Sequence, residues 1–159
     1  MEPINMTNPY AVAYQGNTGR LWIDGEGLYG FQYDSYYRGT FAQVKIQGGY
    51  IEEGGPVMWS AQTRTMIVGD QEAFKSPTFY WLDAHGNVKG ETTLSCSNIG
   101  GDCGIVGATV KGPDLIAADN FGDTVKRFPF PAGGESGLSY AAPFGYEEPF
   151  GVAVSPDIP

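Results

Sequence analysis

The chain has 159 residues, of which 42% are hydrophobic and 17% charged, and this balance excludes an intrinsically disordered chain. A net charge of −9 leaves no basic stripe, which argues against a nucleic-acid partner and against an anionic membrane surface. No apolar run reaches the roughly 20 residues of a membrane-spanning helix, and residues 1–10 do not have the basic and apolar regions of a signal peptide.

Four short apolar segments of similar sequence recur along the chain. They are Pro9–Tyr14, Pro56–Ala61, Cys103–Ala108 and Pro149–Val154, and their first residues stand 47, 47 and 46 positions apart. A fixed period of this length is typical of proteins in which each repeat is one supersecondary unit. The spacing therefore predicts three complete repeats and the beginning of a fourth.

Each of the first three segments is followed by three more predicted strands. These cover 20–24, 28–33 and 40–46, then 65–70, 78–83 and 87–92, then 115–119, 124–130 and 137–142. The link 84–87 carries the Gly and Asn of a tight hairpin turn, and Tyr36 and Tyr37 fall in a link between strands. No segment has a long 3.6-residue period, so no substantial helix is predicted.

Four strands in a unit of about 47 residues are typical of a β-propeller blade. A β-sandwich also has short strands with turns, but it does not repeat four-strand units at a fixed period. We therefore predict an all-β fold, an incomplete β-propeller of four-stranded antiparallel blades, within a single segment 1–159. The blades are expected at about 9–55, 56–102 and 103–148, and the first strand of a fourth within 149–159.

The third repeat resembles a known family. Gly112–Phe128 runs from a Gly-led turn through the strand 115–119 to a strand ending Lys-Arg-Phe, and it resembles the NHL repeat. Pro149–Pro156 resembles the segment that opens the next blade of that family. The resemblance implies a β-propeller, usually of six blades, with a binding or scaffold role.

The lactonase and gluconolactonase propellers are relatives of this group. They often begin with a Glu-Gly-Pro-x-Trp motif whose Glu binds a divalent cation, and Glu53–Trp59 is similar, with one extra Gly and one extra spacer. The resemblance implies Glu53 as a metal ligand, although no positions match that family's Asn and Asp ligands. A divalent-metal-dependent, lactonase-like hydrolase is therefore the alternative function.

No catalytic constellation is visible in the sequence, so no catalytic residue is predicted. The chain contains no Gly-x-Ser-x-Gly elbow, no His-Glu-x-x-His motif and no phosphate-binding Gly loop. Streptogramin-lyase propellers use a catalytic His, but the single His85 lies in a predicted hairpin turn, where a solvated residue is expected. We therefore predict a non-enzymatic binding scaffold.

Acidic residues gather in one set of links. In a propeller, the links from the second strand to the third and from the fourth to the next first strand lie on one face, and here they hold 11 of the 18 acidic residues but only Lys75 of the nine basic ones. With one neighbouring amide, the residues of this predicted face are Asp24, Glu26, Glu52, Glu53, Asp70, Glu72, Asp102, Asp119, Asn120, Asp123, Glu147 and Glu148. An acidic concave face attracts cations.

We therefore predict that this face binds Ca²⁺ or another divalent cation, a small cationic ligand or a protein partner. The candidate metal ligands are Glu53, Asp70 and Asp119. In the alternative interpretation the acidic loops keep the protein soluble and cap turns, and Asp24, Asp70 and Asp119 accept backbone hydrogen bonds where their strands end.

The two cysteines leave two interpretations open. Cys96 and Cys103 lie seven residues apart in a Gly-rich loop, and they form either a disulfide in an oxidising compartment or two reduced thiols. A disulfide, with the acidic, Tyr- and Gly-rich composition, favours an extracytoplasmic location. Because three blades do not close a ring and open blades expose strand edges, we expect either a fragment of a longer protein or a homo-oligomer that completes a ring.

Overall fold

The computed structural model describes residues 6–16, 18–27, 30–38, 40–51, 54–70, 76–96, 102–141 and 149–154, with the backbone alone for 6–8, 26, 27, 30–34 and 41. These ranges contain strands and turns but no helical residue. Accordingly, no helix in them has the length and apolarity that crossing a bilayer requires.

The first sheet consists of β1 (Met6–Gln15), β2 (Arg20–Gly27), β3 (Gly30–Tyr37) and β4 (Thr40–Val44), antiparallel and in chain order. The prediction that Tyr36 and Tyr37 lie in a link is wrong, because Tyr36 pairs with Leu21 on one side and with Phe41 on the other. The strand β2 also continues three residues beyond Asp24, the residue at which it was expected to end.

The second sheet consists of β5 (Gly54–Ser60), β6 (Thr65–Asp70), β7 (Thr78–Leu82) and β8 (Val88–Ser95), again antiparallel and in chain order. The predicted hairpin turn lies between β7 and β8. Asp83 forms it by accepting hydrogen bonds from the backbone N–H groups of His85 (2.9 Å) and Asn87 (3.1 Å). This is the usual way in which an Asp side chain stabilises a turn.

The third sheet consists of β9 (Ile105–Lys111), β10 (Asp114–Asp119), β11 (Thr124–Pro129) and β13 (Leu138–Ala141). Between β11 and β13 the chain leaves this sheet, and β12 (Gly134–Glu135) pairs in parallel with the outer strand β8 of the second sheet. The crossing requires glycine, since Gly133 has a φ of 72° and a Cβ there would overlap the Thr93 carbonyl oxygen.

The expectation of a strand at 149–154 is not met, because these residues form no strand. The segment does lie against β9, where a Cβ on Gly107 would overlap the Phe150 carbonyl oxygen. A strand needs a hydrogen-bonded neighbour, and none of the described residues pairs with this segment.

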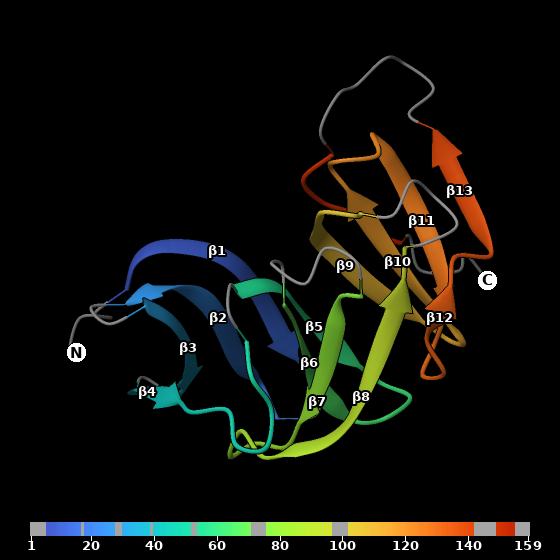
Figure 1. Ribbon diagram of the computed structural model, residues 1–159. Coiled ribbons are helices and arrows are strands. Elements are labelled where there is room, and N and C mark those ends of the chain that lie inside the picture. Colours follow the sequence, from blue (N-terminus) through green and yellow to red (C-terminus); the bar gives the residue numbers. More distant parts are fainter. Residues whose placement is uncertain are drawn as a thin grey trace.

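Successive sheets pack against each other, with β1 beside β5 and β5 beside β9 (Figure 1). We call the space between the first and second sheets the first junction and that between the second and third sheets the second junction. The first junction holds a buried cluster that includes Trp22, Val57, Met66 and Val68. The second holds a cluster that includes Met58, Ile67, Phe79, Ile105, Leu115, Ala117 and Phe128.

Candidate functional site

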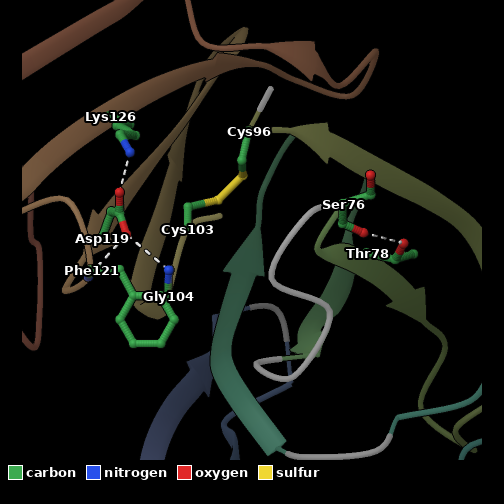
Figure 2. Close-up of a disulfide and its surroundings, with 8 residues drawn as sticks. All are labelled: Ser76, Thr78, Cys96, Cys103, Gly104, Asp119, Phe121 and Lys126. Atoms are coloured by element: carbon green, nitrogen blue, oxygen red, sulfur yellow. Dashed lines mark hydrogen bonds and ion pairs between the residues drawn. A yellow bond between two sulfur atoms is a disulfide. The ribbon is translucent and has the colours of Figure 1, made fainter. Parts of the chain in front are cut away.

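A disulfide between Cys96 and Cys103 crosses the second junction (Figure 2). Cys96 directly follows β8 of the second sheet, Cys103 precedes β9 of the third, and both side chains are fully buried. Their Cα atoms are 5.9 Å apart, within the range that a disulfide spans. The bond therefore ties the end of one four-stranded sheet covalently to the beginning of the next.

Asp119, at the end of β10, lies next to this disulfide and is fully buried. One carboxylate oxygen accepts hydrogen bonds from the backbone N–H groups of Gly104 (2.8 Å) and Phe121 (3.2 Å). The other oxygen is paired with the ammonium of Lys126, which is also almost completely buried (Figure 2). The carboxylate thus fixes the β10–β11 turn and the beginning of β9, and its charge is balanced within the protein.

Asp24 occupies the corresponding sequence position of the first repeat but has none of these partners. Its side chain is fully buried, and neither carboxylate oxygen has a hydrogen-bond partner in the described part of the chain. Burial raises its pKa from 3.8 to about 7; the nearby backbone N–H of Gly25 lowers it in part, although this N–H does not have the geometry of a hydrogen bond. At neutral pH, Asp24 is therefore divided between its protonated and ionised forms.

Strand pairing explains why Asp119 has a cation and why Asp24 has none among the described residues. In the third sheet, Lys126 pairs with Ala117, two residues before Asp119. In the first sheet, the residue that pairs with Trp22, two residues before Asp24, is Ser35. A hydroxyl replaces an ammonium at this position. Neither residue was predicted from the sequence to have a role, although Lys126 lies inside the segment that resembles the NHL repeat.

Alternation along the strands shows which junction each aspartate faces, because residues two apart point to the same face. Asp24 shares its face with Trp22, and Asp70 shares its face with Val68; both apolar residues belong to the cluster of the first junction. Asp119 shares its face with Ala117, which belongs to the cluster of the second. Asp24 and Asp70 therefore come from opposite walls of the first junction.

The other residues of the predicted acidic face are dispersed or not described. Asp102 and Asp123 are exposed, and Asn120 is half-buried. For Glu26 only the backbone, within β2, is described, and Glu52, Glu53, Glu72, Glu147 and Glu148 lie outside the described residues. Among the residues that are described, no three His, Cys, Asp or Glu side chains are grouped as metal ligands would be.

Two neutral oxygens near Asp119 also need explanation. The side-chain oxygens of Asn120 (Oδ1) and Thr124 (Oγ1) are buried without a hydrogen-bond partner in the described part of the chain. Both residues belong to the stretch that leads from β10 into β11. They show that the β10–β11 turn still has acceptor capacity, but its only buried carboxylate is already neutralised by Lys126.

No family model and no curated protein matches this chain. Among solved structures, it is similar to regucalcin, a calcium-binding protein from Agrobacterium tumefaciens, with a TM-score of 0.57 and 17% identity over 79% of this chain and 43% of that one. It is also similar to a periplasmic gluconolactonase from Pseudomonas aeruginosa, with a TM-score of 0.49 and 16% identity over 78% and 40%.

The chain spans less than half the length of these two proteins. At such low identity the likeness to regucalcin shows the fold alone. Together with the successive four-stranded antiparallel sheets, it confirms the predicted all-β, incomplete β-propeller.

Proposed function

We propose that this chain is an NHL-like propeller segment with a binding role, and that it binds a divalent cation or a partner's cationic group at the first junction through Asp24. The observation that carries the proposal is the fully buried carboxylate, which has no hydrogen-bond partner among the described residues. Burying an unpaired carboxylate costs several kcal/mol, and such a group in a native protein is often explained by an ion that completes its shell.

The second junction supports this proposal, because Asp119, at the position that corresponds to Asp24, is paired with a cationic side chain of the protein itself. Lys126 neutralises Asp119, whereas Ser35 supplies no charge to Asp24. A bound cation would neutralise the Asp24 carboxylate at the first junction, as the Lys126 ammonium neutralises Asp119 at the second. Asp70 belongs to the opposite wall of the same junction, and its carboxylate adds to the negative field that attracts cations.

Ca²⁺ is the cation that these donors fit best. The two carboxylates of the first junction are hard oxygen ligands, and backbone carbonyls commonly complete a calcium shell. Asp24 would hold the ion directly, and Asp70 is the candidate second ligand. Because the ion competes with a proton on Asp24, whose pKa is about 7, Ca²⁺ affinity should be about tenfold weaker at pH 6 than at pH 8.

The test is calcium titration by calorimetry together with thermal unfolding. For the unaltered chain we expect binding heat and a stabilisation that reaches about 2.7 kcal/mol at a hundredfold excess of Ca²⁺ over Kd. Asp24→Asn should abolish both effects. Asp123→Asn is the matched control, since it removes the same charge from an exposed turn and should leave binding unchanged. Absence of both heat and stabilisation in the unaltered chain would refute the metal version.

A second candidate function is a metal-dependent, lactonase-like hydrolase, and a single sequence observation favours it. Glu53 directly precedes β5, the first strand of the second sheet, in a segment similar to the motif that supplies a metal ligand in lactonases. The test is hydrolysis of a simple sugar lactone with Ca²⁺, Mn²⁺ or Zn²⁺. A hydrolase predicts turnover that Glu53→Gln abolishes, whereas a scaffold predicts no turnover with any of the three metals.

We also propose that copies of the chain associate through the outer face of β1. Tyr10, Val12 and Tyr14 are exposed there, whereas the corresponding faces of β5 and β9 are covered by the preceding sheet. Size-exclusion chromatography with light scattering should show a homo-oligomer, which Val12→Asp should dissociate. A monomer at all concentrations would rule this association out.

A further inference from the structure

A polar cavity of about 220 Å³ lies at the first junction, at the edge where β2 begins. Its polar lining comes from Arg20, Ser35 and Gln43 of the first sheet and from His85 in the β7–β8 turn of the second. Arg20 begins β2, and Asp24 lies four residues further on, roughly 13 Å along the strand. The cavity is therefore separate from the proposed cation site.

The guanidinium of Arg20 is held in place by three contacts. Its Nη1 donates hydrogen bonds to the Ser35 hydroxyl oxygen (3.3 Å) and to the carbonyl oxygen of Ala84 (3.4 Å). The guanidinium carbon also lies 5.5 Å from the centre of the Tyr37 ring. These contacts join the two sheets and orient the side chain, but no described residue accepts a hydrogen bond from its Nε or Nη2.

No carboxylate among the described residues forms an ion pair with Arg20. In the described part of the chain the ion pairs are Lys89–Asp83, Lys126–Asp119 and Arg127–Asp114, and none includes Arg20. Asp83 belongs to the turn that carries His85, but its oxygens accept hydrogen bonds from Asn87 and pair with Lys89, and it does not line the cavity. The described cavity wall therefore carries a cation and no anion.

The remaining polar side chains of the wall add donors. The His85 ring and the Gln43 amide are exposed, and neither forms a side-chain hydrogen bond with the described residues. An imidazole N–H, an amide NH₂ and the free edge of a guanidinium all donate hydrogen bonds. Such a wall is complementary to an acceptor-rich ligand with negative charge.

From this geometry we propose that the cavity binds a small anionic ligand, a carboxylate or a phosphate, whose oxygens pair with Arg20. Arg is the residue whose planar fork matches both groups with two parallel hydrogen bonds. At about 30 Å³ for each water-sized group, the volume admits about seven non-hydrogen atoms, which is the size of a small organic acid. The site would make the first junction a place where ligands of opposite charge bind four residues apart along β2, at Arg20 and at Asp24.

The experiment titrates the protein with malonate and, separately, with inorganic phosphate, and follows the His85 ring and Arg20 Nε–H signals by NMR. Saturable shifts of both signals with either probe support the site, and the tighter probe identifies the ligand class. If neither probe shifts these signals at millimolar concentration, the proposal is wrong.

Three variants locate the binding. Arg20→Gln should weaken it at least tenfold, and Gln43→Glu should do the same by placing a carboxylate in the wall without removing any bond of Arg20. Arg64→Gln is the matched control, because this exposed arginine lies in the β5–β6 turn and does not line the cavity. If Arg20→Gln does not fold, Gln43→Glu alone decides. Equal weakening by Arg64→Gln would show nonspecific attraction and overturn the proposal.

Discussion

At the second junction, a disulfide joins the sheets, and the buried Asp119 has two N–H donors and the Lys126 ammonium. At the first junction, the described part of the chain supplies no hydrogen-bond partner for the buried Asp24 and no carboxylate paired with Arg20, which lines a cavity. The strands are of the same kind at both junctions, so the difference comes from a few polar side chains. Where charges are balanced internally, a junction contributes stability; where they are not, we propose that it binds ligands of opposite charge.

The largest effect is expected from Lys126→Met, which removes the internal cation but keeps a side chain of similar length. Asp119 would then be buried without its counter-charge, and breaking a buried ion pair in this way costs about 3–5 kcal/mol. Urea denaturation measures the loss. Lys89→Met is the control, because Lys89 is exposed and its pair with the half-buried Asp83 should contribute at most about 1 kcal/mol. Similar losses for the two variants would mean that the second junction does not depend on this pair.

The next largest effect is a pH dependence that belongs to the first junction. The folded chain keeps the proton of Asp24 up to about pH 7, whereas the unfolded chain releases it near 3.8, so stability falls as the pH rises between these values. At about 1.4 kcal/mol per pKa unit, the contribution lost between pH 5 and pH 8 is about 2–3 kcal/mol.

Urea denaturation from pH 5 to pH 8 in a chelator measures this dependence. Asp24→Asn should flatten it and should be more stable than the unaltered chain at pH 8, whereas Asp123→Asn should keep the slope because its side chain is exposed. An unaltered chain that is equally stable at both pH values would contradict the picture of an unpaired, buried Asp24.

The sheets could be predicted because similar apolar segments recur in the sequence every 46 or 47 residues. The segments that begin at Pro9, Pro56 and Cys103 locate β1, β5 and β9 to within a few residues. The strand β12 could not be predicted, since a two-residue strand has no periodicity and its partner lies in another sheet. The segment 149–154 shows the limit of the repeat: an apolar pattern alone does not make a strand without a pairing partner.

Which buried aspartate has a cationic partner could not be predicted from the sequence positions of the aspartates themselves. Asp24 and Asp119 follow similar apolar residues, and both are fully buried. What separates them is the cross-strand neighbour, Ser35 in one sheet and Lys126 in the other, and this depends on strand register. Sequence reasoning therefore found the candidate acids but assigned no role to Lys126, the residue that decides which of them is balanced.

The smallest effect is expected from Thr92→Val in β8, a change that tests how far the second junction depends on neutral polar contacts. The Thr92 hydroxyl accepts a hydrogen bond from the Trp81 indole N–H (3.0 Å) and donates one to the carbonyl oxygen of Pro131 (3.0 Å), so it connects the second sheet to the segment that precedes β12. Valine keeps the shape but leaves both partners unpaired, which should cost about 1–2 kcal/mol in urea denaturation.

Thr93→Val is the matched control, because its hydroxyl is exposed and pairs with Thr78 within the same sheet, and we expect a change of at most about 0.5 kcal/mol. If Thr92→Val costs no more than this control, the second junction is held by its ion pair, its disulfide and its apolar cluster alone.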